Sequence, residues 1–272
     1  MLSRGPLLFI GLWCLSSLSV MLFSFDYQTI YLDRILQAPG WGAWLGYDEL
    51  GRAIVDRLIV GAHTSFIIAV SVVVISFVGG TAIGIMSAWL GGWYDRIIVM
   101  LIDLFMAFPG LLLAIALAGL LGPGLSNAVI ALTVVGWVGF ARLARAQTLS
   151  VRERQHVQAA HALGSGTVYI ASRHIFPLVL APLIVQATFE LAGTVIAEST
   201  LSFLGIGVQA PAASWGSMIR DGMRYMLIAP HVVMAPGAAI FLVVMSINMF
   251  GDRLRDKMDV HLNDQARGKT CH

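Results

Sequence analysis

The stretch between Arg57 and Asp95 limits the possible folds of this chain more than any other feature, because it contains no Asp, Glu, Lys or Arg. A helix needs about 20 consecutive apolar residues to cross a bilayer core about 30 Å thick. The whole chain of 272 residues fits such a setting, since 58% of it is hydrophobic and only 12% is charged. An ordinary soluble domain carries about 25% charged residues. We therefore expect an all-α integral membrane protein, and the net charge of +2 gives no indication of a nucleic-acid partner.

Six windows are apolar enough for membrane-spanning helices. They are Pro6 to Phe25, Ala62 to Trp89, Ile97 to Leu121, Leu125 to Ala141, Pro177 to Leu204 and His231 to Phe250. The first window could also be a signal peptide with Arg4 as its basic end, but it is longer than the ~7–15 apolar residues of such a peptide, which favours a retained anchor helix. Pro109 is expected to kink the third window. Gly80, Gly84 and Ala88 form a small-residue face for helix packing in the second window.

The distribution of Lys and Arg sets the orientation, because these residues are enriched in cytoplasmic segments. With the N-terminus inside, twelve of the 17 Lys and Arg residues fall in cytoplasmic segments and five in external ones. We therefore expect both termini in the cytoplasm. The chain then divides into an anchor helix (1–25), an external loop (26–61), a core (62–258) with a cytoplasmic connecting segment (143–176), and a cytoplasmic tail (259–272).

The connecting segment has the residues of two helices joined by a tight turn. Arg142 to Leu163 contains no Gly or Pro and is predicted to be one helix. Gly164 suits the left-handed conformation that ends a helix, and Ser165 offers an N-cap for a second short helix that ends near Phe176. Pro177 then starts the fifth span.

The surface of the first of these helices suits contact with another protein. Small side chains let a partner approach closely, while Val157, His161 and Leu163 supply contacts. A short helix of this kind fits into a partner's groove. The alternative is a connecting loop that packs on its own helix bundle.

The same segment resembles the EAA loop of ABC-importer permeases. The matching residues are Gln158-Ala159-Ala160-x-x-x-Gly164 followed by His174-Ile175-x-Pro177, with Gln158 where the family has Glu. The sequence LGYDELGRAIVDRLIVGAHTS resembles a block of the dipeptide, oligopeptide and nickel branch, with Ala53 where Asp is usual. Further blocks that begin at Asp95, Glu198 and Asn248 extend the resemblance over residues 45–258.

This resemblance implies six transmembrane helices in the type I ABC-importer permease fold, in a bacterial inner membrane. A second permease subunit, expected to form a heterodimer with this chain, would complete the pathway. Two ATPase subunits would bind ATP and Mg, and a periplasmic or lipid-anchored binding protein would deliver the substrate. This chain itself would hold no cofactor and would not be an enzyme. The residues implied in coupling to the ATPase are Val157, Gln158, Ala159, Ala160, His161, Leu163 and Gly164. Di- or oligopeptides are the first expectation for the substrate, and nickel, metal–chelator complexes, opines and glutathione stay open.

Three acidic residues lie at membrane depth, where ionisable groups are functional candidates by default. Glu190 is the deepest and is the first candidate for a residue that faces the pathway, with Asp103 and Glu198 after it. For Asp103 the competing interpretation is a structural ion pair with Arg142 or Arg145. For Glu198 it is a bond to the backbone of the following loop, and for Glu190 an interhelical hydrogen bond or a protonated, buried carboxyl.

The external segments 26–61 and 205–230 lie where a binding protein would arrive. Trp and Tyr prefer the headgroup level and Arg reaches water from there, so the second segment suits a short helix at the membrane interface. The residues expected to take part in docking are Tyr47, Arg52, Trp215, Arg220 and Arg224.

Other functions lack the residues that they need. The tail sequence Gly268-Lys269-Thr270 is not a P-loop, because Asn263 stands where that motif has its first Gly. His156 and His161 do not have the spacing of a zinc-binding HExxH motif, and we expect no metal site. A membrane enzyme would need a nucleophile–base or metal cluster. A self-sufficient secondary transporter remains an alternative of a different class and would show an internal repeat.

Overall fold

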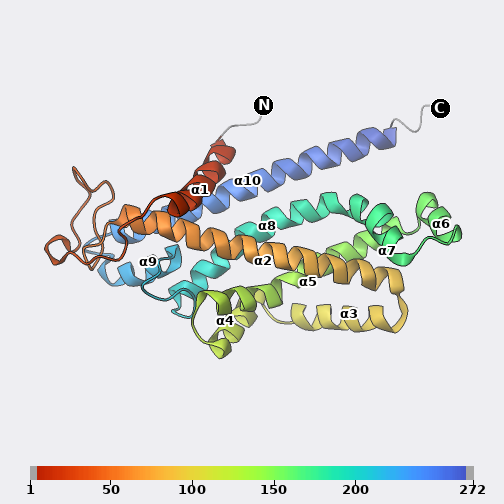
Figure 1. Cartoon of the computed structure of the whole chain (residues 1–272), viewed down its shortest axis with the longest axis horizontal. Helices are drawn as coiled ribbons and strands as arrows, with labels where there is room; N and C mark the ends of the chain where they lie inside the picture. Colours follow the sequence, from red (N-terminus) through yellow and green to blue (C-terminus); the bar gives the residue numbers. More distant parts are fainter. Residues whose placement is uncertain (1–4, 268–272) are drawn as a thin grey trace. The chain divides into compact units, whose positions relative to one another are not determined.

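The computed structural model is helical almost throughout (Figure 1). It describes residues 5–267, and the side chains of residues 5–258 apart from that of His161. In chain order the elements are α1 (Gly5–Leu22), η1 (Leu32–Arg34), α2 (Ile54–Leu90), α3 (Gly92–Met106), α4 (Gly110–Leu121), α5 (Leu125–Val151), α6 (Gln155–Ala162), α7 (Thr167–Ile170), the π-helical turn η2 (Ala171–Ile175), α8 (Phe176–Phe203), α9 (Trp215–Gly222), η3 (Met223–Tyr225) and α10 (His231–Arg267). Within residues 5–267 there is no β-strand.

The expected spans are present as helices. Among the described residues five helices are long and apolar enough to cross a membrane, namely α1, α2, α5, α8 in continuity with α7, and α10, or six spans if α3 and α4 together count as one. α2 starts before the predicted Ala62 and α10 runs past the predicted Phe250. Both extensions carry charged residues, which an apolar window does not detect.

The third window is not one kinked span, as Pro109 led us to expect, but two helices. α3 ends at Met106, and α4 begins at Gly110. Proline removes one helical hydrogen bond and crowds the carbonyl four residues earlier. Here the helix stops before Pro109 and a new one starts after it.

The predicted single helix from Arg142 to Leu163 is also wrong. α5 ends at Val151, residues 152–154 form a turn, and α6 starts at Gln155. The backbone N–H of Arg154 bonds to the carbonyl of Val151 within this turn, at 3.0 Å. No Gly or Pro marks the break, so its position is set by contacts that are distant in sequence.

The turn after α6 forms as predicted, whereas the following helix begins differently. Gly164 has a φ of +81°, in the left-handed region. The N-cap of α7 is Gly166 rather than Ser165, and α7 continues through η2 into α8. Pro177 lacks the N–H that would bond to the carbonyl of Arg173, and proline rings crowd that carbonyl. The wider π-helical turn lies directly before this residue.

Two compact units make up the chain. The first comprises residues up to 72, 111–132 and 191–247, and the second comprises residues 73–110, 133–190 and those from 248 onward. The long helices α2, α5, α8 and α10 each contribute residues to more than one of these groups.

Two tryptophans lie in the core of the first unit. The indole N–H of Trp13 donates to the carbonyl of Ala62 at 3.1 Å, and that of Trp215 donates to the carbonyl of Leu58 at 3.0 Å. The Trp13 ring also meets Phe66 edge to face, with 5.2 Å between ring centroids. Trp13 and Trp215 therefore fix α1 and α9 to the first turns of α2.

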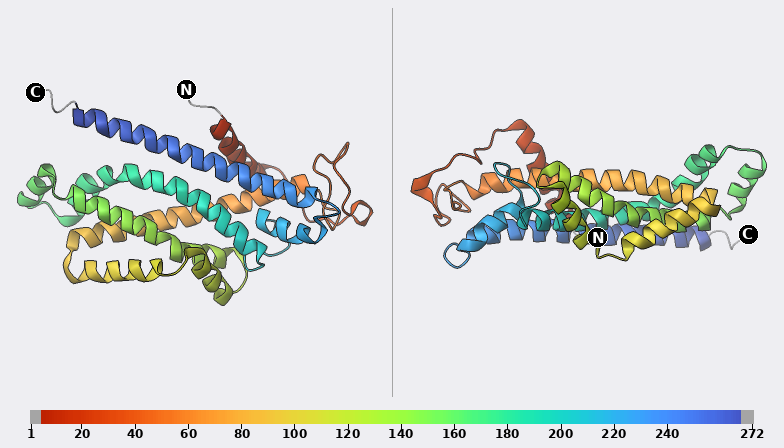
Figure 2. Two further views of the ribbon diagram at one scale, coloured as in Figure 1. Left: turned by 180° about the vertical axis from the view of Figure 1, so that it is seen from behind. Right: turned by 90° about the horizontal axis from the view of Figure 1, so that it is seen from below.

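α9 also packs against α10. Figure 2 shows α9 beside the first turns of α10, where Gly222 lets the two helices approach closely.

In the second unit, α2 and α5 pack through the small residues predicted for this role. A side chain at Gly80 would collide with the carbonyl of Trp137, and one at Gly84 with the carbonyl of Ala141. Such close backbone approach is the purpose of small residues in membrane helices. The expectation that Gly80 and Gly84 serve helix packing is confirmed.

Candidate functional site

The connecting segment presents an apolar surface in the second unit. Leu163 is 86% exposed, and Val168 and Tyr169 are exposed as well. Ala160, by contrast, is only 9% exposed, and Val157 is fully buried. Of the residues predicted to couple to an ATPase, Gln158, Ala159, Leu163 and Gly164 therefore lie at the surface, while Val157 and Ala160 point inward. The side chain of His161 lies outside the described part of the chain.

Two arginines, Arg145 on α5 and Arg152 in the turn after it, connect this segment to the end of α2 and the start of α3. Arg145 Nε and Nη2 each donate to one carboxylate oxygen of Asp95, both at 2.7 Å, and Ser87 Oγ donates to the same carboxylate at 2.6 Å. Two turns further on, Arg152 Nη1 donates to the carbonyl of Ala88 at 2.8 Å. A cation that bonds the last carbonyls of a helix also stabilises the negative end of its dipole. The beginning of α6 is therefore tied to the end of α2.

A cavity of about 280 Å³ lies at the same junction. Trp89, Arg152, Glu153, Val157 and Gln158 line it. Gln158 Nε2 donates to Glu153 Oε2 at 3.4 Å, and Arg152 Nε donates to Glu153 Oε1 at 3.2 Å. The residue that departs from the family pattern, Gln158, thus lies next to a carboxylate from the preceding turn.

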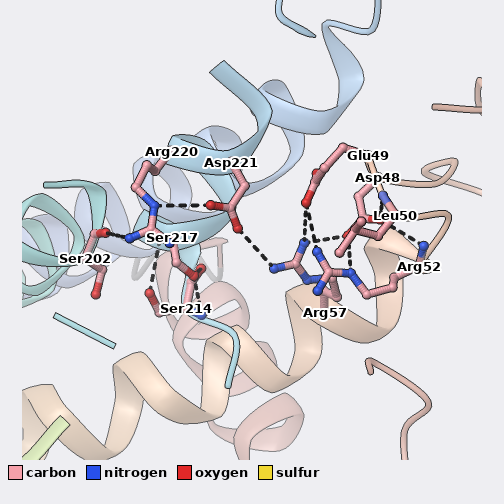
Figure 3. A network of polar contacts seen from close by, with 10 residues as sticks. All are labelled: Asp48, Glu49, Leu50, Arg52, Arg57, Ser202, Ser214, Ser217, Arg220 and Asp221. Atoms are coloured by element: carbon pink, nitrogen blue, oxygen red, sulfur yellow. Dashed lines mark hydrogen bonds and ion pairs between the residues drawn. The ribbon is translucent and has the colours of Figure 1, made fainter. Parts of the chain in front are cut away.

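A network of charged residues occupies the beginning of α2 in the first unit (Figure 3). At its centre is the buried carboxylate of Asp48, which accepts from the backbone N–H groups of Leu50 and Arg52, both at 2.9 Å. Arg52 Nε donates to it at 2.8 Å, and Arg57 Nη1 donates to it as well. A buried charge is stable only when it is paired and hydrogen-bonded in this way.

The network extends to α9. Arg57 Nη2 lies 3.6 Å from Asp221 Oδ2, and Arg220 Nε donates to Asp221 Oδ1 at 3.1 Å. Arg220 Nη1 also donates to the carbonyl of Ser202 at 3.3 Å. α9 begins with a capping box in which Ser214 and Ser217 exchange hydrogen bonds. The loop before α2, α2 itself, α9 and the end of α8 are therefore linked through a single chain of polar contacts (Figure 3).

Two buried atoms of this network have no hydrogen-bond partner among the described residues, namely Arg57 Nε and Glu49 Oε2. The other carboxylate oxygen of Glu49, Oε1, accepts from Arg52 Nη2 at 2.9 Å. Burial raises the pKa of the Glu49 carboxyl above its usual value, and the neighbouring charge of Asp48 raises it further. The ionised form of Glu49 is consequently less favourable here than in water.

The residues predicted for docking have different environments. Arg52 is 9% exposed and Trp215 is 2% exposed, so the chain itself buries both side chains and leaves little of them for a docking partner to contact. Tyr47 and Arg220 are partly exposed, and Arg224 is exposed. Sequence reasoning missed Asp48, Arg57 and Asp221. The spacing of Asp48 and Arg52, four residues apart, was a usable signal for the first of these contacts.

Two of the three acidic residues proposed to face the pathway, Asp103 and Glu198, have contacts that differ from the ones we expected. Asp103 is exposed and forms no ion pair within the described residues, because Arg145 binds Asp95 instead. Glu198 is fully buried and accepts hydrogen bonds from Ser65 and Ser202, both at 2.9 Å. Its link to the following loop is indirect, since Ser202 Oγ accepts from the N–H of Val208.

Glu190 lies where α8 meets α2 and α5. A side chain at Gly136 would come within 2.8 Å of Ser76 Oγ and 3.5 Å of Glu190 Oε1. Ser76 Oγ is buried and has no partner. These groups make a polar position between otherwise apolar helices of the second unit.

Within the described residues, no group of three or more His, Cys, Asp or Glu side chains could hold a metal ion. The Nδ1 atom of His63 lies 3.1 Å from Ser17 Oγ, within hydrogen-bond distance. The tail residues Gly268, Lys269 and Thr270 lie outside the described range.

Three comparisons place the chain among known proteins. Residues 80–262 match the family model "Binding-protein-dependent transport system inner membrane component". The chain is 38% identical over 264 residues to "Dipeptide transport system permease protein DppC" of Alkalihalophilus pseudofirmus, covering 95% of this chain and 87% of that protein. It is 37% identical over 238 residues to "Glutathione transport system permease protein GsiD" of Pectobacterium atrosepticum, covering 88% of this chain and 77% of that protein.

The fold has a counterpart among solved structures. An inward-facing structure of the MetNI methionine ABC transporter matches with a TM-score of 0.59, covering 73% of this chain and 95% of that one. At 20% sequence identity this match supports the fold alone.

Proposed function

Because the chain belongs to the family of binding-protein-dependent transport system inner membrane components, we propose that it forms half of a translocation pathway for di- or oligopeptides. It is a permease subunit of an ABC importer, and the ATPase is a separate subunit. The single observation that carries the peptide assignment is the similarity to a dipeptide permease over 95% of this chain. Glutathione, the substrate in the name of the second relative, is itself a small peptide.

The connecting segment is the proposed contact with the ATPase. Its apolar residues Leu163, Val168 and Tyr169 are left exposed by the described part of the chain. Arg152 and Arg145 connect the same segment to α2 and α3, so that a displacement of α6 is passed on to the spans. Two ATPase subunits and a second, non-identical permease complete the proposed complex, and they carry its ATP and Mg.

The orientation follows from the distribution of Lys and Arg. We place both termini in the cytoplasm of a bacterial cell, and the chain in its inner membrane. The external loop and α9 then face the side from which a periplasmic or lipid-anchored binding protein delivers the substrate. Tyr47, Arg220 and Arg224 are the exposed docking candidates in these segments.

Reconstitution of the full complex in proteoliposomes tests the proposal. Partner subunits encoded beside this chain are co-expressed, and uptake-coupled ATP hydrolysis is measured with a dipeptide, with glutathione and with nickel. We expect a dipeptide-loaded binding protein to stimulate hydrolysis. Stimulation by nickel alone would transfer the role to metal import, and uptake without any ATPase would contradict the importer assignment itself.

A further inference from the structure

Two opposite charges lie unpaired on the surface of the second unit. Asp103 of α3 and Arg142 of α5 are both exposed, and neither has an ion-pair partner among the described residues. Asp103 lies at membrane depth, and Arg142 directly follows the apolar window that ends at Ala141. A charge at such a depth is costly in contact with hydrocarbon. This surface therefore faces water or protein, and not lipid tails.

The one hydrogen bond of the Arg142 side chain directs its charge into the span. Arg142 Nη1 donates to Met106 Sδ at 3.5 Å, and a thioether sulfur is a weak acceptor. Met106 lies about 16 Å past Asp95 along α3, whereas Arg142 is only one turn from Arg145, the partner of Asp95. Long basic side chains near the end of a span usually extend outward to water. Arg142 instead extends toward the middle of the span, and its charge stays uncompensated there.

Asp103 is one helical turn from this contact. It precedes Met106 by about 4.5 Å along the axis of α3, and residues three apart are neighbours on a helix surface. A guanidinium and a carboxylate in the same region would satisfy each other as an ion pair. No such pair joins Arg142 and Asp103. Both charges are therefore available to a ligand on the same side of the unit.

A series of polar groups leads from Arg142 along α5 into the membrane. A side chain at Gly139 would come within 3.4 Å of Gln186 Nε2. One at Gly136 would come within 3.5 Å of Glu190 Oε1. Gly136, Gly139 and Arg142 follow one another at three-residue intervals, which makes them neighbours on the surface of α5. A charged molecule that passes along this helix thus meets Glu190, Gln186 and Arg142 in turn.

A permanent contact with another subunit is a poorer explanation of the two unpaired charges. Buried charges in such a contact are stable only when each is paired, so the partner would have to carry two opposite charges at matching positions. A substrate with an ammonium at one end and a carboxylate at the other supplies both partners at once and removes them on release. These ends are about 7 Å apart in an extended dipeptide, which is comparable to one helical turn.

We propose that Arg142 binds the C-terminal carboxylate of the transported peptide and Asp103 its N-terminal ammonium, in the half of the pathway nearer the cytoplasm. The inference rests on the proposed function and adds the chemistry by which the permease itself recognises the substrate. Arg binds carboxylates through two parallel hydrogen bonds, and Asp103 attracts an ammonium but not an acylated nitrogen. Peptides with two free ends are favoured over blocked peptides and over a bare metal cation, which Arg142 repels.

The test is equilibrium binding to the full, nucleotide-free complex in proteoliposomes without the binding protein. Labelled dialanine is displaced by unlabelled dialanine, by its C-terminal amide and by its N-acetyl form. We expect the wild-type complex to bind each blocked form about tenfold more weakly. Arg142→Gln should lose the preference for the free carboxylate and keep that for the free amine. Asp103→Asn should show the reverse, and Arg96→Gln, at an exposed arginine of α3, should keep both preferences.

The crossed pattern separates recognition from a structural role. If Arg142→Gln weakens the binding of dialanine and of its amide equally, the proposal is overturned. If Arg142→Gln does not assemble, Arg142→Lys decides, because lysine keeps the charge but lacks the paired donors. The carboxylate preference should then fall about threefold, and an unchanged preference overturns the proposal. Absent or equal binding of the three peptides by the wild-type complex overturns it as well. The proposed function fails separately, if the complete complex with its binding protein imports no dipeptide.

Discussion

Arg145 on α5 holds the carboxylate of Asp95 with two parallel hydrogen bonds of 2.7 Å, fifty positions away in sequence. Ser87 on α2 donates to the same carboxylate at 2.6 Å. The contact thus joins the end of α2, the start of α3 and the helix that leads to the connecting segment. Paired charges of this geometry resist separation better than single hydrogen bonds do.

Separating Arg145 from Asp95 should weaken the coupling of ATP hydrolysis to uptake. Both side chains are about one-quarter exposed, so we expect a pairwise energy of about 1–2 kcal/mol. A double-mutant cycle with Arg145→Ala and Asp95→Ala, followed by thermal unfolding, measures it. Arg154→Ala, an exposed arginine three residues past the end of α5, is the matched control. Additive effects of the two changes would show that the pair contributes nothing.

Removal of Arg57 should destabilise the external end of the first unit strongly. Asp48 would keep its burial but lose one of its two guanidinium partners, and breaking a buried pair in this way costs about 3–5 kcal/mol. We expect Arg57→Met to reduce assembly and thermal stability. Arg34→Met, a change at an exposed arginine of the loop before α2, should have little effect. Equal thermal stability of the two variants would contradict the structural role of the network.

Gly164→Val should uncouple transport from ATP hydrolysis. A side chain at this position meets open space, so the effect comes from the φ of +81° alone, which costs a residue other than glycine about 1–2 kcal/mol. Gly166→Val tests the same turn at an ordinary φ of −66°. Uptake per ATP should fall for the first variant and stay near wild type for the second. Unchanged uptake by Gly164→Val would remove the turn from the mechanism.

Cysteine cross-linking should distinguish the two faces of the segment around α6. Leu163 is exposed, so Leu163→Cys should trap an ATPase subunit, whereas Ala160→Cys points into the chain and should react poorly. The yield of cross-linked species on gels measures this difference. Preferential trapping by Ala160→Cys would mean that the opposite face docks. Labelling of Leu163→Cys by an external, membrane-impermeant reagent would show that the topology is the reverse of the one we predict.

Glu190→Gln should leave a folded complex with altered transport. A charge at membrane depth costs from about 2.5 kcal/mol upward unless it reaches water or a partner, and a water-lined pathway provides the first. Glu190→Gln keeps the shape and the hydrogen bonding but removes the charge. We expect altered uptake with normal assembly. Wild-type uptake by Glu190→Gln, combined with failed assembly of Glu190→Leu, would make Glu190 a structural hydrogen-bonding residue.

Sequence reasoning located the spans and the Gly164 turn because both depend on local chemistry. An apolar run of membrane length can form few structures other than a membrane-spanning helix. A glycine that follows a helix readily adopts the left-handed conformation that ends it. The break at residues 152–154 was missed, and the break at 107–109 was expected as a kink at Pro109 rather than as two separate helices. The form of both breaks depends on contacts that the local sequence does not contain. Arg152, for example, reaches a carbonyl 64 positions away.

The candidate site was predicted less completely than the fold. Gln158, Ala159, Leu163 and Gly164 were placed on the surface as expected, but Val157 and Ala160 face inward. Arg52 and Trp215 were expected to take part in docking because they lie in the segments 26–61 and 205–230. Their burial results from partners that only the folded chain supplies, namely Asp48 for Arg52 and the carbonyl of Leu58 for Trp215.

The π-helical turn Ala171–Ile175 sets the rotation of the connecting segment about the axis of α8. A π-helical turn contains one residue more than the α-helical turn that it replaces, and each α-helical residue turns the chain by about 100°. Deletion of one residue from this turn would leave an uninterrupted helix from α7 into α8. It would also swing Leu163 and the exposed face beside it about a quarter of the way round the axis of α8. The direction in which the proposed ATPase-contact surface points therefore depends on the one extra residue of this turn, and not on the identity of any side chain.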